Sequence, residues 1–217
     1  MEVRRIATHL PGVLFYIITF TRNVKTIAMS HIATKKVYTL FTGALLTGLS
    51  FFASAQTITS DQIKAQFVKD WERAKTYTLD YLNAMPTDKY SFKPIDSIRS
   101  FSQQMLHLAQ DNFAPLIATA TGAQVPETIK QRDLENSPGA QSKDSVVYFV
   151  TISYDFAIQS IKDLSPAKYG EMVSLSKWKE TRFAMLEKAF EHQTHHRGQT
   201  TIYIRLQGIK PPGERLF

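Results

Sequence analysis

Apolar residues recur every three or four positions in four stretches of the chain, which is the spacing of one face of an α-helix. The pattern predicts helices over about residues 60–85, 98–121, 142–163 and 177–207. The stretches between them are rich in proline, glycine and polar residues, and none is predicted to form a strand. Four amphipathic helices in one chain predict an all-α fold, a four-helix bundle.

Residues with known capping roles mark the helix ends. Ser60 is expected to cap the first helix, and Pro86 is expected to end it. Pro115 falls inside the second pattern and predicts a kink or a break, because proline lacks the backbone N–H that a helix interior uses. Gly208 and the prolines that follow it predict the end of the fourth helix.

The fourth helix has a stripe that mixes apolar residues with histidines. Its members are four and three positions apart, the spacing of a seam facing a bundle interior: Met185, Ala189, His192, His196, Gln199, Tyr203 and Leu206. His192 and His196 are one turn apart on this stripe, so their imidazoles can converge on one point. His195 is rotated by about 100° from His196 and is expected at the bundle edge or on the surface.

Only one histidine of residues 56–217 lies outside the fourth helix, and it is His107 on the second helix. Asp111 follows it by one turn on the polar edge of that helix. A cluster of His107, His192 and His196 would leave coordination positions of a divalent metal open, as in catalytic rather than structural sites. The alternative is that these histidines are core residues with ordinary hydrogen-bond partners.

Residues 29–55 have the three-part order of a secretory signal peptide. Lys35 and Lys36 form a basic start, residues 37–52 are apolar, and the small residues 53–55 form a cleavage site. We expect cleavage after Ala55 and export to the periplasm or the medium. The alternative is an uncleaved anchor helix, although residues 37–52 are short for a membrane span. Residues 1–28 are interpreted as an extension of the gene model or as part of a leader, which leaves one domain over 56–217.

Charge and cysteine content narrow the function classes. Of the 26 Lys and Arg and the 19 Asp and Glu, residues 1–55 hold six and one, so residues 56–217 hold 20 and 18, a net charge of +2. The chain's formal charge of +7 therefore belongs mostly to the leader, and a nucleic-acid partner is not expected. The absence of cysteine excludes disulfides, thiolate metal sites and a cysteine nucleophile.

Two motifs resemble the DinB-like (DinB/YfiT-type) metal-binding family. The first is "HQTHHRGQTTIYIRLQGIKPP", in which a histidine is followed after three residues by His-Arg-Gly-Gln, an apolar run, and Gly before Pro. The second is "MPTDKYSFKPIDSIRSFSQQMLHLAQDN", with a Met-Pro helix end, an aromatic-x-Pro segment and a histidine on the second helix. The resemblance covers about residues 60–212.

The resemblance implies a bundle of up-down-down-up order, in which a long crossover makes the second and third helices parallel. It also implies a divalent metal held by His107, His192 and His196, with His195 outside the ligand pattern. Beside these, Arg197 is expected to pair with an acid or a carbonyl, and glycine at position 198 is expected to allow close approach of another helix or loop.

The chemistry expected of such a site is that of a metal-dependent hydrolase or transferase acting on an unknown small molecule. Asp111 and Glu191 are candidate acid/base groups, and Tyr203 is a candidate hydrogen-bond donor. The alternatives are a non-catalytic metal- or ligand-binding bundle and a thiol-dependent S-transferase, as some relatives are. An oxidising compartment disfavours the transferase. A membrane-tethered interaction protein is a further alternative if the leader is retained.

Zinc is the metal expected by default, and nickel, iron and copper are also compatible with three imidazoles. No stable membrane association is expected after cleavage of the leader. A homodimer is a further possibility that the resemblance raises.

Overall fold

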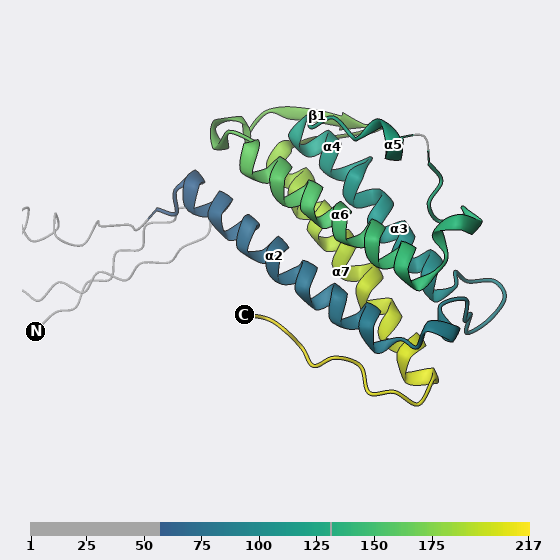
Figure 1. Cartoon of the computed structure of the whole chain (residues 1–217). Coiled ribbons are helices and arrows are strands. Elements are labelled where there is room, and N and C mark those ends of the chain that lie inside the picture. The colour runs from purple at the N-terminus through teal and green to yellow at the C-terminus, as the bar shows by residue number, and fades with distance from the viewer. Residues whose placement is uncertain (1–56, 131) are drawn as a thin grey trace, which may run out of the picture. The chain divides into compact units, whose positions relative to one another are not determined.

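The computed structural model describes residues 57–130 and 132–217, which contain one helical bundle (Figure 1). Its four long helices are α2 (Ser60–Ala84), α3 (Phe101–Phe113), α6 (Lys143–Asp163) and α7 (Arg182–Leu206). The expected leader segments 1–28 and 29–55 lie outside the described residues. In the part of the chain that is described, no helix combines the length and apolar character needed to cross a membrane.

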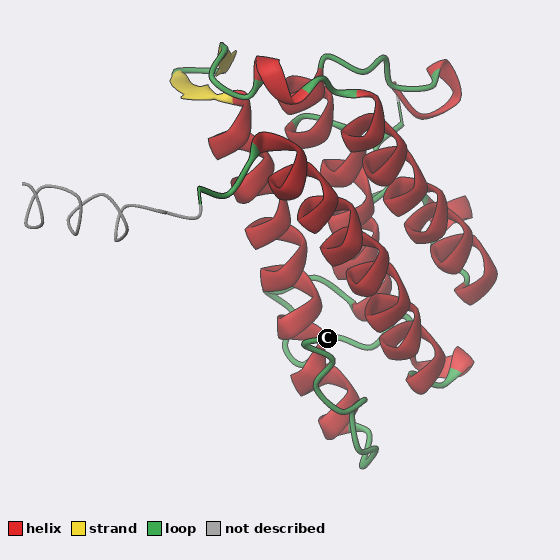
Figure 2. Cartoon of the chain, turned by 90° about the vertical axis from the view of Figure 1, so that its left-hand side faces the viewer, coloured by secondary structure: helices red, strands yellow, loops and turns green. Residues whose placement is uncertain are grey.

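Five short elements and one hairpin connect the bundle. The short helices are η1 (Thr87–Lys89), α4 (Leu116–Thr121), α5 (Glu127–Lys130), η2 (Pro138–Ala140) and η3 (Pro166–Lys168). The strands are β1 (Met172–Leu175) and β2 (Trp178–Thr181). Helices dominate, and the hairpin lies at one end of the bundle (Figure 2).

The order of the bundle is up-down-down-up, which confirms the all-α fold class. The starts of α3 and α6 lie together, because Ser102 Oγ donates to Gln141 Oε1 at 2.7 Å, and farther along Asn112 contacts Ser153. These two helices are therefore parallel, and the chain between them crosses the length of the bundle (Figure 1).

The helices begin at side-chain caps. Thr59, not Ser60, caps α2: its hydroxyl accepts from the Gln62 N–H, and the Gln62 side chain accepts from the Thr59 N–H in return. The prediction of Ser60 was wrong by one residue because both hydroxyls suit the position, and only Thr59 has Gln three residues later to complete a capping box. Ser142 caps α6 and Thr181 caps α7 by the same kind of bond.

Pro115 interrupts the second helical pattern, as predicted. Helix α3 ends at Phe113, and α4 resumes at Leu116 with Pro115 as its N-cap. The predicted start at residue 98 was early, since Ser100 caps α3 with its own capping box.

The hairpin of β1 and β2 corrects the predicted start of the fourth helix. Residues 177–181 were expected to be helical, but Leu175 pairs with Trp178 and Met172 pairs with Thr181 in an antiparallel register. A two-residue turn connects the strands, and its first residue, Ser176, has a φ of 53°, outside the helical region. Four-residue strands with one exposed face give too little alternation to detect.

The core between the helices is aromatic and aliphatic. Trp71 from α2 and Tyr154 from α6 are fully buried, with ring centroids 5.7 Å apart, and Trp71 also meets Phe190 of α7 edge to face. Burying aromatic surface contributes the largest share of the free energy of folding per side chain. A Cβ at position 198 would meet nothing within 4 Å, so the expected close approach at that glycine was wrong.

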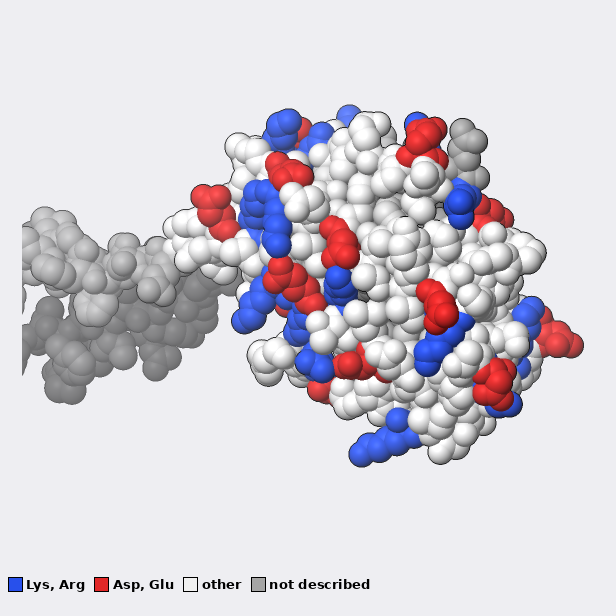
Figure 3. Space-filling model, viewed as in Figure 1, with Lys and Arg blue, Asp and Glu red and all other residues white. Residues whose placement is uncertain are grey.

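Charged side chains cover the outer face of α2 and α6 with both signs interspersed (Figure 3). Two ion pairs cross between these helices, Lys75–Asp155 at 2.6 Å and Lys162–Glu72 at 2.9 Å. Exposed pairs of this kind contribute at most about 1 kcal/mol each. The expectation that nucleic acid is not a partner stays a prediction.

Candidate metal centre

Three histidines from two helices meet at one point of the bundle. His107 of α3 faces His192 and His196 of α7, and one ring nitrogen of each lies within 4.8 Å of the others. The ring centroids are 4.3 Å apart for His192 and His196 and 4.5 Å apart for His107 and His196. The structure therefore brings together the three residues that the sequence singled out, as a group that could hold a metal ion.

The group lies at the edge of the core rather than on the central seam of α7. Met185, Ala189, His196 and Tyr203 of the predicted seam are buried. Helix α7 also buries a second stripe, shifted by one position: Leu186, Gln193, Arg197, Thr200 and Ile204. The predicted seam was therefore wrong in part: Leu206 is 56% exposed and Gln199 is exposed, whereas His196 is 7% exposed. Side chains of His107 and His192 retain 21% and 23% exposure, so solvent reaches the group.

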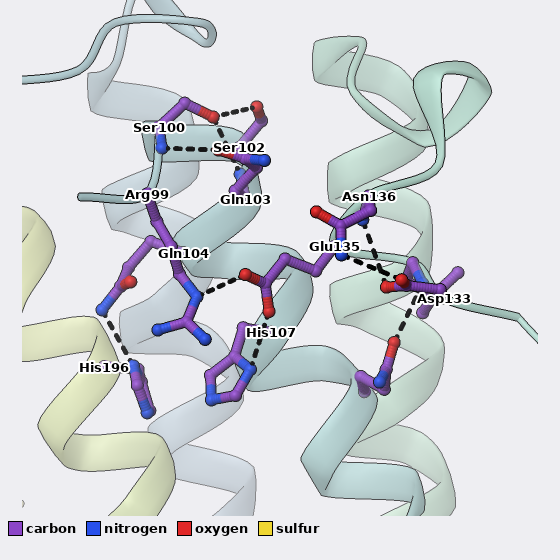
Figure 4. Close-up of polar contacts among 12 residues, drawn as sticks. Arg99, Ser100, Ser102, Gln103, Gln104, His107, Asp133, Glu135, Asn136 and His196 are labelled. Carbon is purple, nitrogen blue, oxygen red and sulfur yellow. Dashed lines mark hydrogen bonds and ion pairs between the residues drawn. The ribbon is translucent and has the colours of Figure 1, made fainter. Parts of the chain in front are cut away.

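A carboxylate fixes the orientation of the His107 ring. Nδ1 of His107 lies 3.0 Å from Oε2 of Glu135, and Oε1 of Glu135 accepts from Nε of Arg99 at 2.6 Å (Figure 4). Since a carboxylate only accepts hydrogen bonds, the proton of a neutral His107 is on Nδ1, and the lone pair on Nε2 faces the other histidines.

An amide plays the corresponding part for His196. Nδ1 of His196 lies 2.8 Å from the Gln104 side-chain amide (Figure 4). The Gln104 amide also contacts the Gln199 amide. Amide oxygen and nitrogen are assigned from the hydrogen-bond network. A cation on Nε2 of His196 requires a proton on Nδ1, and Gln104 then accepts with its oxygen. The Gln199 amide turns with it, and His195, 2.9 Å from Gln199, then donates.

Asp111 lies beside the remaining ring. Its Oδ2 is 3.1 Å from Nε2 of His192 and 3.8 Å from Nε2 of His107. Nδ1 of His192 is buried and has no hydrogen-bond partner among the described residues. The carboxylate is thus on the side of the group to which two Nε2 atoms point.

Burial favours the neutral form of His196 and His107. It lowers the pKa of His196 to about 3, with the neighbouring His192 and His107 rings adding to the effect. Burial also lowers the pKa of His107, against the opposing charge of Asp111. Neutral imidazoles with a free lone pair are the form that binds metal ions.

Among the described residues, the other two predicted site residues, Glu191 and Tyr203, form no hydrogen bond with the three histidines. Glu191 is exposed, and no hydrogen bond or ion pair joins it to a histidine in residues 57–130 or 132–217. Tyr203 is 5% exposed and donates its hydroxyl to the Arg99 carbonyl at 2.9 Å, and burial raises its pKa. His195 is exposed, packs edge to face against His196 with ring centroids 5.0 Å apart, and contacts the Gln199 amide at 2.9 Å.

Three partners of the group were missed from the sequence: Gln104, Arg99 and Glu135. Gln104 precedes His107 by three residues on α3, so helical spacing could have found it. Glu135 and Arg99 stand on connecting segments without periodicity, and neither gives a signal that distinguishes it from a surface charge.

The comparisons with known proteins agree on one family. A model of the DinB family matches residues 56–215. A search of curated proteins found no match.

Solved structures show the same fold. A DinB-like protein from Bacillus cereus ATCC 10987 has a TM-score of 0.58 at 17% identity, over 68% of this chain and 95% of that one. A DinB-like protein from Bacillus subtilis has a TM-score of 0.53 at 21% identity, over 70% and 96%. A conserved protein from Enterococcus faecalis has a TM-score of 0.50 at 16% identity, over 66% and 96%. With a family model covering most of its length and a bundle of the same fold, the chain belongs to the DinB family.

Proposed function

We propose that this chain binds one divalent metal ion through His107, His192 and His196 and uses it in a metal-dependent hydrolase- or transferase-type reaction on a small molecule. The observation that carries the proposal is the convergence of three imidazoles, two of which are held in place through their Nδ1 atoms. His107 is held by Glu135 and His196 by Gln104. Such contacts orient metal-binding histidines and raise their basicity.

The residues fit a divalent ion by two further features. The buried Nδ1 of His192 lacks a partner, and a buried polar atom in that state costs about 1–3 kcal/mol. A cation bound at this nitrogen would supply the missing partner, while Nε2–H of His192 donates to Asp111. The set has nitrogen donors without thiolate, which suits zinc, nickel, copper and ferrous iron, and zinc is the default assignment.

Three ligands and partial exposure favour a reactive site over a structural one, because structural sites are usually closed by four protein ligands. A divalent ion there supplies Lewis-acid chemistry, polarising an oxygen atom and promoting loss of its proton. Asp111 provides the proton acceptor: its Oδ2 lies next to the Nε2 atoms of His107 and His192. Glu135 and Gln104 hold the rings in the required tautomers.

A second candidate is a non-catalytic bundle that binds a metal or a small ligand. It is favoured by the placement of two predicted helpers, since Glu191 is exposed and the Tyr203 hydroxyl is engaged with the Arg99 carbonyl. Among the described residues, Asp111 then remains the one predicted acid/base group that contacts the histidines on their Nε2 side. Export of the protein, proposed from residues 29–55, disfavours a reaction that depends on a reduced thiol.

Metal content tests the proposal. The chain is purified without chelator or polyhistidine tag, and its metals are measured by mass spectrometry in the wild type and in His107→Ala, His192→Ala and His196→Ala. We expect about one ion per wild-type chain and its loss in all three variants. His195→Ala is the matched control, because the residue is adjacent and exposed, and should keep the ion. Retention of metal in the three variants would refute the site.

Asp111→Asn separates the two candidates. A proton acceptor that is not a ligand should leave the metal content unchanged and abolish turnover in a screen of esters, amides and phosphoesters. Loss of the ion in Asp111→Asn would instead make Asp111 a ligand. No turnover in the metal-loaded wild type on any substrate class would leave the binding bundle as the function.

A further inference from the structure

A hollow of about 570 Å³ opens beside the histidine group, between the segment before α3 and the end of α7. Its walls are apolar where Pro94, Ile98 and Ile202 contribute, and polar where Arg99, Gln104 and Gln199 contribute. Ile98 and Ile202 are 38% and 56% exposed, so they present apolar surface to the hollow. The residues that line the hollow include one cation and no acid.

Arg99 is held in place with part of its guanidinium unused. Its backbone carbonyl accepts from Tyr203, and its Nε donates to Glu135 at 2.6 Å. No hydrogen bond or ion pair among the described residues engages either Nη atom of Arg99. Figure 4 shows the guanidinium between the Glu135 carboxylate and the helix that carries His196. An arginine with fixed Nε and two free Nη groups is prepared to donate to an anionic group.

One residue, Gln104, connects the hollow to the histidine group. Gln104 lines the hollow and contacts Nδ1 of His196 at 2.8 Å, and the Arg99 partner Glu135 contacts Nδ1 of His107 at 3.0 Å. Gln104 alone therefore separates a molecule in the hollow from the His196 ring, whereas Arg99 and Glu135 lie between it and the His107 ring.

We propose that this hollow is a binding site for a small monocarboxylate with an apolar body, whose carboxylate is bound by Arg99. The hollow lies on the side of the His196 ring that carries Nδ1, where Gln104 separates it from the ring. The inference goes beyond the proposed function, because binding depends only on the residues of the hollow.

The charges favour a carboxylate over a phosphate. Arg99 is the single cation of the lining, and Glu135 already neutralises part of it. A phosphate dianion would bring two negative charges against one shared positive charge, whereas a carboxylate balances it and matches the two Nη donors. The isoleucine and proline surfaces then cover an aliphatic or aromatic body, and the amides of Gln104 and Gln199 supply neutral hydrogen bonds.

Calorimetric titration of the full chain loaded with zinc tests the inference. The probes are hexanoate, the neutral isostere hexanamide, and inorganic phosphate. We expect hexanoate to bind the wild type at least about tenfold more tightly than hexanamide, the size expected of a charge-assisted hydrogen bond. Arg99→Gln should remove this preference, and Arg99→Lys should leave an intermediate one. Arg205→Gln, which removes an exposed arginine of α7, should keep it in full.

Metal content is measured for the same samples. An unchanged preference in Arg99→Gln with zinc still bound would overturn the inference and leave the metal site standing. Phosphate binding as tight as that of hexanoate would overturn the carboxylate assignment. An Arg99-dependent preference in a wild type that holds no metal would support the hollow as an anion site and reject the metal-dependent function.

Discussion

Helix α7 contributes to two polar clusters on neighbouring stripes, through Gln193 and Arg197 on one and His192 and His196 on the other, and the two clusters behave in opposite ways. On its buried stripe, Arg197 donates to Gln193 at 2.8 Å, Tyr154 donates to the same oxygen at 2.8 Å, and Thr78 lies 2.7 Å from the Tyr154 hydroxyl. These groups satisfy one another without an acidic residue. On the neighbouring stripe, a hydrogen bond to Nδ1 orients the His196 ring, and its Nε2 has no hydrogen-bond partner among the described residues.

The difference separates a structural polar cluster from a functional one. Arg197 was expected to pair with an acid or a carbonyl, and the partner is the amide carbonyl of Gln193, with the Tyr77 ring 4.7 Å from the guanidinium carbon. A closed network of this kind rigidifies a core. Histidines with free lone pairs, partial exposure and an adjacent carboxylate leave bonding capacity for something that the chain itself does not supply.

The largest expected effect concerns the cluster of His107, His192 and His196. Zinc at a thousandfold excess over its Kd should raise the free energy of unfolding by about 4 kcal/mol, because the ion binds the folded state. His196→Ala should remove this gain. Denaturant unfolding with and without zinc measures it, and His195→Ala is the control. Equal stabilisation of both variants would place the ion elsewhere.

Changes in the buried cluster of Arg197, Gln193, Tyr154 and Thr78 should instead lower stability and leave metal binding unchanged. Arg197→Ala leaves the carbonyl of Gln193 and the hydroxyl of Thr78 with fewer partners in the core, and should lower the free energy of unfolding by about 2–3 kcal/mol. The metal content per folded chain should not change. Arg205→Ala, at an exposed position on the same helix, should cost less than about 0.5 kcal/mol. Loss of metal without loss of stability would contradict the separation of the two clusters.

A smaller effect is expected at the carboxylate behind His107. Glu135→Gln weakens the acceptor for Nδ1–H and should reduce zinc affinity by about 10- to 100-fold. Competition with a fluorescent chelator measures the affinity. Glu127→Gln makes the same change on the exposed surface of α5 and should have no effect. Unchanged affinity in Glu135→Gln would show that the contact does not act on the metal.

The smallest effect is on pH dependence without metal. The folded pKa of His196 is lowered to about 3, from 6.5 for an unperturbed histidine. The unfolded chain therefore takes up this proton first on acidification, so the stability is present above pH ~6.5 and is lost as the pH falls toward 3. About 1 kcal/mol should be lost between pH ~6.5 and ~5.5 from this group. His196→Ala should make the curve shallower, and a wild type that gains stability over this range would contradict the sign.

Helical periodicity was sufficient to predict the four bundle helices and the break at Pro115, because each depends on local pattern and backbone chemistry. It missed part of the buried face of α7, since Gln193, Arg197 and Thr200 are polar. Gln193 and Arg197 have partners on α6 and α2, and Thr200 donates to the Arg197 carbonyl of its own helix. Spacing found His192 and His196. Their meeting with His107 depended on the relative placement of α3 and α7, which one helix pattern does not contain.

Glu135, which the sequence did not single out, also has a consequence for how such a protein evolves. Glu135 belongs to the crossover between α5 and α6, whereas all three histidines belong to bundle helices. Substitutions and length changes in connecting segments disturb packing less than those in helices. The ligands are thus tied to the stability of the bundle, while the group that adjusts their basicity is free to vary. Substitutions at position 135 can in this way change which metal is bound and which reaction is catalysed, while the bundle fold stays the same.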